Sequence, residues 1–400
     1  MPRDERVAVR RDKPWPAINV LHATDFHNRA NSGIAFAVNE LATQTARQIS
    51  PQGSVSIVRI GGTDIALDQG VRHLTVNPSR GLLRMWRYAP AYGRMCQSAL
   101  KKDDVSVAHI HGVWMYPQFS AACVAQRLDI PTVLTNHGGL QWALRQPRGL
   151  GALKKRLYVA LMRDRLLRRI TVQHAITRQD RDAVYSFFPH RRIEIIPNFL
   201  DLEKVDHDLG AYCTGSSGAG APYILYLGRL HPTKGVDMLI EAFGRARIPR
   251  DWRLIIVGPT VDREYAGRLK RLIRASPRSP RIEIRGPEWH LGAKYRLMRD
   301  AWVTVLPSHT EVVSLVNLES SACFTPTITT TMTGLDDWTE GGGVLIEPEI
   351  EQLAKALSET TLWSDQERRD RGLASRRLTE QRYSAAAVMP HWLELYKSLH

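Results

Sequence analysis

Short apolar runs alternate with segments of helical periodicity along the first half of the chain. The apolar runs predict strands over residues 18–23, 54–60, 105–111, 132–136, 170–175 and 193–197. Apolar positions that recur every three or four residues predict helices over 34–46, 92–101 and 119–128. Strands that alternate with helices are typical of parallel βαβ layering, so this half is predicted to form a doubly wound parallel sheet.

The second half of the chain repeats this pattern. It predicts strands over 223–228, 252–258, 281–286 and 301–306, and helices over 236–246, 265–275 and 292–300. Residues 209–222 separate the halves, and their glycine, serine and alanine without periodicity indicate a flexible connector. We therefore expect a mobile basic tail at 1–16, a first α/β domain at 17–205, a linker at 206–221, a second α/β domain at 222–380 and a terminal helix at 381–400.

Two doubly wound domains joined by one linker would enclose a cleft. The length of 400 residues favours two cores over one. In open α/β sheets, ligands bind at the carboxyl ends of the strands, and interfaces between domains favour sites that close on a hinge. We therefore expect the functional residues in the loops that follow the strands.

The stretch 307–338 follows the last predicted strand and carries Glu311 and Glu319. We expect Glu311 in a loop and Glu319 two turns into the next helix, with both carboxylates directed into the cleft. Backbone amides at the start of that helix would favour an anion. These amides belong to Ser314, Leu315 and Val316. Two glutamates at this spacing are also typical of solvated helix charges, so the pair alone does not identify a site.

A second loop places an arginine and a lysine between glycines. It follows the strand at 223–228 and contains Gly228, Arg229, Lys234 and Gly235. Arginine grips pairs of phosphate oxygens and lysine adds a point charge, so this loop is suited to a diphosphate. A Walker loop needs serine or threonine directly after the lysine, where this chain has glycine, which excludes an NTPase loop.

Two further candidates lie in the first domain. His137 follows the strand at 132–136 and precedes two glycines, which allow a ligand to approach the backbone. A lone histidine at such a position is more often structural than functional. Gly33 precedes the helix at 34–46, but the pattern G-x-G-x-x-G is missing, which argues against a nicotinamide or flavin enzyme.

The net charge of the chain restricts the classes of molecule that it can bind. The net charge of +15 suits nucleic acid, an anionic membrane surface or phosphorylated small molecules. The segment 153–170 sets seven basic side chains against leucine and valine. Such a helix lies on a membrane surface or packs on a core with its basic face in water. Aromatic and zinc motifs of nucleic-acid modules are missing, so no nucleic-acid partner is expected.

Cysteine usage and hydropathy favour a cytosolic protein. The four cysteines are far apart and follow no C-x-x-C spacing, which argues against disulfides and zinc. No window approaches 18 uninterrupted apolar residues, so no transmembrane helix is expected. The N-terminus is charged and lacks the apolar core of a signal peptide.

Taken together, the motifs resemble those of one family. The pattern G-R-L-x-x-x-K-G, followed roughly eighty residues later by E-x7-E, is similar to retaining glycosyltransferases of family 4, the group 1 glycosyltransferases with the GT-B fold. Residues 195–198 resemble the family's I-P-N-G motif. Residues 109–114 and 137–144 resemble members that build surface polysaccharides or lipid-linked glycans, and residues 382–396 resemble the segment that crosses back onto the first domain.

The resemblance implies a role for each candidate. Arg229 and Lys234 would bind the diphosphate of a sugar nucleotide, and Glu319 would hold the ribose hydroxyls. Glu311 would lie near the donor sugar, which His137 would reach from the first domain. The remaining donor contacts would come from Gly33, Gly228, Ser314, Leu315 and Val316. The product would keep the anomeric configuration of the donor, and no cofactor is implied because the sugar nucleotide is a substrate.

Three departures from the family pattern favour an alternative function. The family has glycine where this chain has Ser314, Phe324 and Phe199, and a phenylalanine at 324 would bring bulk next to the phosphate site. The alternative is a catalytically weak member that acts as a binding or scaffold subunit. The D-x-D matches at 180–182 and 206–208 lie outside the expected cleft loops, so no metal is expected.

The expected function is that of a retaining, metal-independent, hexosyltransferase-type enzyme. It would move a sugar from a UDP- or GDP-sugar to a glycan or polyprenyl-linked acceptor in surface polysaccharide or lipopolysaccharide biosynthesis. Its basic charge suits an anionic membrane surface. The expected location is therefore the cytoplasm, with peripheral association at the inner face of the cytoplasmic membrane.

Overall fold

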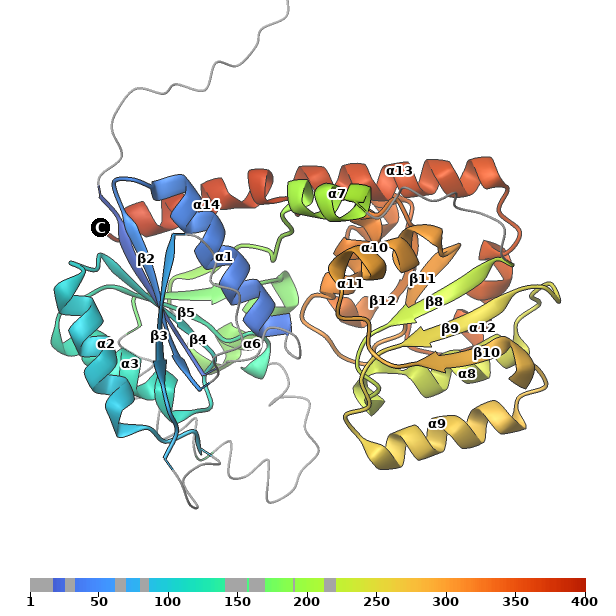
Figure 1. Cartoon of the computed structure of the whole chain (residues 1–400), viewed down its shortest axis with the longest axis horizontal. Coiled ribbons are helices and arrows are strands. Elements are labelled where there is room, and N and C mark those ends of the chain that lie inside the picture. The colour runs from blue at the N-terminus through green and yellow to red at the C-terminus, as the bar shows by residue number, and fades with distance from the viewer. Residues whose placement is uncertain are drawn as a thin grey trace, which may run out of the picture.

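The computed structural model describes residues 17–25, 33–61, 70–79, 86–140, 157, 170–189, 191–211 and 221–400. These residues form two α/β lobes that lie side by side, with two helices near the C-terminus running along one edge of both lobes (Figure 1). The expected fold class is confirmed: two doubly wound parallel sheets, with a terminal helix that returns to the first. The predicted tail at 1–16 and nearly all of the basic segment at 153–170 lie outside the described residues.

The first sheet has seven strands within the described residues, in the order β3-β2-β1-β4-β5-β6-β7. Their bounds are Asn19–Thr24 (β1), Ser54–Ile60 (β2), Val71–Val76 (β3), Val107–His111 (β4), Thr132–Thr135 (β5), Val172–Ala175 (β6) and Ile193–Ile195 (β7). The strand missing from the prediction is β3. It forms the sheet edge, and its polar residues Arg72, His73 and Thr75 break the apolar run.

Helices cover both faces of the first sheet. They are α1 (Gly33–Ile49), α2 (Pro90–Lys102), α3 (Tyr116–Arg127) and α6 (Arg178–Phe187), whereas α7 (Leu202–Ala211) packs on the second domain. Tyr92 of α2 and Ala121 of α3 pack in one core with Leu21 and Ile110 of the sheet. The opposite face is covered by α1 and by α14 (Ala385–Lys397). The strands are buried on both faces, as their nearly continuous apolar runs require.

The second sheet has the order β10-β9-β8-β11-β12-β13. Its strands are Tyr223–Leu227 (β8), Arg253–Val257 (β9), Ile282–Arg285 (β10), Val303–Leu306 (β11), Thr327–Thr330 (β12) and Val344–Ile346 (β13). Its helices are α8 (Val236–Arg245), α9 (Arg263–Ala275), α10 (Leu291–Asp300), α11 (Leu315–Ala322) and α12 (Ile350–Thr360). The prediction lacked β12 and β13, because β12 reads Thr-Ile-Thr-Thr and β13 has three residues.

Two C-terminal helices connect the lobes. α13 (Asp365–Arg382) packs on the second domain, and α14 returns to the first, where Val388 and Trp392 join a core with Val20 and Val107. α7 contacts the second domain through α10. The expectation of a flexible connector from 206 or 209 is wrong at its start, since α7 continues to Ala211. Residues 212–220 lie outside the described residues.

The strand order places one candidate site at each sheet. Chain order reverses between β1 and β4 in the first sheet and between β8 and β11 in the second. At such a switch point, ligands bind in the crevice outside the carboxyl ends of the strands. The loops after β8 and β11 are the two that the sequence motifs singled out.

Candidate active site

The loop after β8 is held against the loop after β11 by a glycine. Gly235 has φ +65, and a side-chain carbon there would lie 2.1 Å from the carbonyl oxygen of Pro307, so only glycine fits. The amide of His309 donates to the carbonyl of Thr233 at 2.9 Å. Gly228 has φ +155, and its carbonyl oxygen lies where a side chain on Gly258 would stand. These close contacts fix the position of the basic residues.

Lys234 and Glu311 form an ion pair between the two loops. Lys234 Nζ lies 2.5 Å from Glu311 Oε1, and the hydroxyl of Ser308 donates to Oε2 at 3.0 Å. Each partner of the pair keeps 17% of its side-chain surface exposed, so the pair lies at the surface of the crevice and not in the core. The structure thus brings two of the predicted site residues into direct contact.

Arg229 borders the same crevice. Its side chain is exposed, and its carbonyl accepts a hydrogen bond from the Tyr226 hydroxyl at 2.9 Å. Burial, the charge of Arg229 and, more weakly, that of Lys234 lower the pKa of His231, which stands between them in the loop. Both cations therefore act on the same imidazole.

The first backbone amides of α11 follow this ion pair. Ser314 caps the helix with φ −82 and ψ 103, a conformation that any residue adopts, so serine is compatible with the position where the family has glycine. The amides of Leu315 and Val316 are the first in the helix and have no acceptor within it. They add partial positive charge to the crevice.

Glu319 lies one turn into α11, not two, and its partner is a residue that the sequence reasoning missed. Its Oε1 lies 2.6 Å from Nζ of Lys294 on α10, and the two side chains are 6% and 14% exposed. Oε2 takes part in no hydrogen bond within the described part of the chain. A lysine 25 positions before a glutamate carries no local signal, because only the sheet order makes α10 and α11 neighbours.

The two domains meet beside this crevice. A side-chain carbon on Gly33, at the start of α1, would lie 3.8 Å from Leu315 Cδ1. Phe36, one turn further along α1, and Leu315 both pack against the same apolar cluster. Across the same junction, Gln179 Nε2 donates to the carbonyl of Thr331 at 3.2 Å. Gly33 therefore stands at the wall of the first domain that faces the α11 N-terminus.

His137 follows β5 and lines a small cavity in the first domain. Its backbone is left-handed, with φ +51. The cavity has a volume of about 20 Å³, room for one water molecule or one hydroxyl group, and is lined by α1, α14 and polar residues that include His174 and Asn198. Among the described residues, no hydrogen bond or ion pair joins His137 to the second domain.

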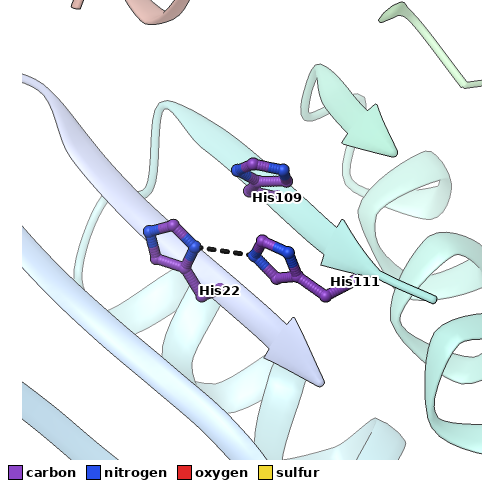
Figure 2. Close-up of side chains that lie close together, drawn as sticks. All are labelled: His22, His109 and His111. Carbon is purple, nitrogen blue, oxygen red and sulfur yellow. Dashed lines mark hydrogen bonds between the residues drawn. The ribbon is translucent and has the colours of Figure 1, made fainter. Parts of the chain in front are cut away.

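His137 ends a row of three imidazoles, formed by His22, His111 and His137, which we call the histidine row. His22 Nδ1 lies 2.9 Å from His111 Nε2, and His111 Nδ1 lies 3.1 Å from His137 Nε2. His22 on β1 faces His109 and His111 on β4, because alternate residues of paired parallel strands share one face (Figure 2). Burial, with a smaller effect of His174 on His137, lowers the pKa of His22 and of His137 to about 3.

Two histidines of the row, together with the neighbouring His109, could also bind a metal ion. Possible ligand atoms of His22, His109 and His111 lie within 4.8 Å of one another, among the residues that the structure describes. Both ring nitrogens of His109 are already engaged, Nδ1 with the Tyr396 hydroxyl at 2.8 Å and Nε2 with Thr135 Oγ1 at 2.7 Å. A metal ion would have to displace one of these bonds, so the geometry favours a hydrogen-bonded network.

The expectation that Phe324 crowds the phosphate site is wrong. Phe324 follows the C-terminus of α11, and the eight residues of this helix place it about 12 Å from the N-terminal amides. Its φ of +59 is the left-handed conformation that ends many helices and explains why glycine is common there. Its ring lies 5.2 Å from the guanidinium of Arg376 on α13.

The two D-x-D matches have structural partners. Asp180 is fully buried and accepts hydrogen bonds from the amide of Ile176 and from the side chain of Asn136. Asp206 on α7 forms a two-pronged ion pair with Arg376, with both distances 2.8 Å. These carboxylates are engaged in contacts that hold the fold together.

Two family profiles match the chain. Residues 32–198 match the glycosyl transferase 4-like domain, and residues 216–373 match the glycosyl transferases group 1. Within the described residues, no helix is both long and apolar enough to cross a membrane.

Curated relatives and solved structures extend the similarity. The D-inositol 3-phosphate glycosyltransferase of Xylanimonas cellulosilytica is 29% identical over 222 residues, which span half of each chain. The O-antigen chain mannosyltransferase C of Escherichia coli is 25% identical over 311 residues, 74% of this chain and 76% of the relative. The structure of Anabaena HepE with UDP and glucose matches with a TM-score of 0.73 at 17% identity, and covers 95% of this chain and 100% of HepE. Since a glycosyl transferase 4-like profile matches the first domain, a group 1 profile matches the second and the whole fold follows the GT-B arrangement, the chain belongs to the group 1 glycosyltransferases.

Proposed function

We propose that this glycosyltransferase moves a hexose from a UDP- or GDP-sugar to a glycan or lipid-linked acceptor, with retention of the anomeric configuration. The observation that carries the proposal is the Lys234–Glu311 pair beside the exposed Arg229, at the point where strand order reverses between β8 and β11. Open α/β sheets bind nucleotides at this point.

The charges of the crevice suit the chemistry. Breaking a glycosyl-phosphate bond leaves negative charge on the diphosphate. Arg229, Lys234 and the α11 amides would stabilise this charge more strongly in the transition state than in the ground state, because the charge develops as the bond breaks. Glu311 holds the Lys234 ammonium in place and would contact the donor sugar.

Glu319 is suited to the ribose. Lys294 occupies one carboxylate oxygen and neutralises the buried charge, which otherwise would be costly to bury. The second oxygen can accept hydrogen bonds from the ribose hydroxyls. In this proposal Gly33 leaves room for the donor beside Leu315, and His137 contacts the sugar from the first domain.

We propose that the reaction uses no metal and no cofactor. Arg229 and Lys234 would supply the positive charge that a divalent ion supplies in other transferases. The leaving phosphate oxygen would take the proton of the acceptor hydroxyl, so that no separate base is required and the sugar adds to the face from which the diphosphate leaves. Turnover should therefore be unchanged in EDTA, whereas loss of activity that Mg²⁺ or Mn²⁺ restores would contradict this point.

For the acceptor, we propose a growing surface polysaccharide on a polyprenyl carrier, at the inner face of the cytoplasmic membrane. The similarity to an O-antigen mannosyltransferase and the net charge of +15 support this, since each basic residue near an anionic leaflet contributes about 1 kcal/mol. Flotation with anionic liposomes tests it. Charge reversal at Lys154, Lys155 and Arg156 should reduce flotation, and equal flotation of this variant would contradict the role of that segment.

A donor screen tests the function itself. The purified chain is incubated with radiolabelled UDP- and GDP-sugars and a lipid extract, and transfer to lipid is counted. We expect transfer from one donor and its loss in Arg229→Ala. The second candidate, a binding or scaffold subunit, predicts a nucleotide-dependent rise in Tm without transfer. Since Phe324 lies away from the phosphate site, the departure that most favoured this second candidate no longer supports it.

A further inference from the structure

A chain of hydrogen bonds beneath α14 has its direction set by a backbone carbonyl. His174 Nε2 lies 2.9 Å from the carbonyl of Ile196, which can only accept, so Nε2 carries the proton. In a neutral ring Nδ1 then accepts, and the Thr135 hydroxyl donates to it at 2.8 Å. Thr135 Oγ1 in turn accepts from His109 Nε2, and His109 Nδ1 accepts from the Tyr396 hydroxyl. His109 and His174 are therefore both Nε2–H tautomers.

In the histidine row, the direction of the hydrogen bonds is set by His22. His22 is fully buried, and its Nε2 has no hydrogen-bond partner within the described residues. A buried N–H without an acceptor is rarer and more costly than an unpaired acceptor, so Nε2 is unprotonated and Nδ1 carries the proton. His22 Nδ1–H then donates to His111 Nε2, and His111 Nδ1–H donates to His137 Nε2. The proton of His137 is left on Nδ1.

We propose that the histidine row fixes His137 as its Nδ1–H tautomer and presents this N–H as a hydrogen-bond donor to an oxygen of the bound sugar. His22 and His111 are positioning residues that act through His137. The nature of the ligand rests on the proposed function, whereas the tautomer rests on the hydrogen bonds alone. The cavity beside His137 has room for a single hydroxyl group.

This arrangement excludes one role for His137. Its Nε2 already accepts a hydrogen bond from His111, and its Nδ1 already carries a proton, so neither nitrogen is available to take the acceptor's proton. Burial, supported by the nearby His174, lowers the pKa of His137 to about 3, so the ring stays neutral at physiological pH. His137 therefore orients the sugar and is not the base of the reaction.

Nitrogen-15 NMR of the full chain with labelled histidine tests the tautomers directly. Long-range correlations to the ring carbons distinguish Nδ1–H from Nε2–H, and spectra of single histidine variants assign the signals. We expect Nδ1–H for His22, His111 and His137, and Nε2–H for His109 and His174 in the same spectrum. An Nε2–H signal for His137 would overturn the proposal, whatever the activity of the enzyme.

A matched pair of variants tests the consequence for the reaction. In His22→Asp the carboxylate can only accept, so His111 and His137 should both turn to Nε2–H. In His22→Asn the amide can still donate and the order should persist. We expect kcat/KM to fall about 10-fold in His22→Asp relative to His22→Asn, the effect of one lost hydrogen bond. Equal activity with reversed tautomers would refute the donor role.

Two results separate this inference from the proposed function. If the predicted tautomers are found but no sugar nucleotide supports transfer, the proposed function fails and the tautomer assignment stands. If His22→Asp does not fold, His137→Asn and His137→Leu replace the pair, since asparagine retains a donor and tolerates a positive φ. Transfer by His137→Leu equal to that of His137→Asn would then refute the donor role.

Discussion

Glu311 holds the ammonium of Lys234 in the position where, in the proposed function, it would bind the diphosphate. The sequence indicated both residues through their motifs, but not their contact, because 77 positions separate them. The contact depends on Gly235, which lets the loop after β8 approach Pro307. A point charge that the fold positions in advance needs no reorganisation when the leaving group departs.

Replacement of Lys234 by alanine should lower kcat/KM about 100-fold, in the range found when one charged or oxyanion-stabilising group is lost. Lys234→Arg should recover part of the activity, because the charge is kept while the geometry changes. Steady-state transfer with the preferred donor measures both. Lys355→Ala on α12 is the control, since that side chain is 77% exposed, and an equal loss in the control would contradict the assignment.

A substitution of Phe324 tests whether its ring affects donor binding. Because it lies beyond the C-terminus of α11 with φ +59, Phe324→Gly relieves a left-handed backbone and removes the ring contact with Arg376. We expect KM for the donor to stay within about twofold, as for surface substitutions. A several-fold fall in KM on this change would show that the ring does crowd the phosphate site.

At the level of helices, α7 and α13 are joined by one arginine. Arg376 is 7% exposed and donates to Asp206 on α7, to Glu380 on its own helix and to the carbonyl of Ala322. We call this set of contacts around Arg376 the clasp. It holds α7, and with it the connection between the domains, against the second domain. The helix α7 continues to Ala211, where composition alone predicted a connector.

Loss of this clasp should destabilise the protein. Arg376→Ala leaves the buried Ala322 carbonyl without its donor and removes a two-pronged ion pair, which together should cost about 2–3 kcal/mol of unfolding free energy. Chemical denaturation measures this cost. The neighbouring Arg377 is exposed, so Arg377→Ala should change stability by less than about 0.5 kcal/mol, and similar losses in both variants would argue against the clasp.

Most strands and helices could be predicted because their apolar periodicity is strong. The exceptions have a physical reason: β3 is a polar edge strand, and in β12 threonine hydroxyls are satisfied inside the core, as when Thr330 donates to the carbonyl of Ser308. The end of α11 shows the same limit at the site. The sequence predicted that a phenylalanine in a glycine position would obstruct the phosphate site, but the bounds of α11 place Phe324 beyond the C-terminus of the helix, away from its N-terminal amides.

Across the whole molecule, the contacts that the sequence could not predict are those between distant segments. Lys294 meets Glu319 only because β10 and β11 stand on either side of β9 and β8 in one sheet. The histidines meet because β1 pairs with β4 in a register that sets His22 beside His109. Histidines two positions apart on a buried strand were the available signal, since alternate residues share a face.

The buried histidines should make stability depend on pH. Burial lowers the pKa of His22 to about 3 and that of His174 to about 4, below the value of about 6.5 in the unfolded chain. Between these values the unfolded chain binds more protons, so stability is full above pH 6.5 and falls as the pH falls towards 4. At pH 5, each of these two histidines lowers the free energy of unfolding by up to about 2 kcal/mol.

Thermal unfolding measures this effect. The Tm should be lower at pH 5 than at pH 7, and the difference between the two values should be smaller in His22→Asn than in the wild type. An equal difference in the two proteins would contradict the role of His22.

The most direct test of the central claim is transfer of radiolabelled sugar from a panel of UDP- and GDP-sugars to a lipid extract, in EDTA, by the wild type and Lys234→Ala. The account predicts transfer from one donor by the wild type, with the anomeric configuration kept in the product and a rate about 100-fold lower in the variant. No transfer from any donor, or equal rates for the two proteins, would contradict it.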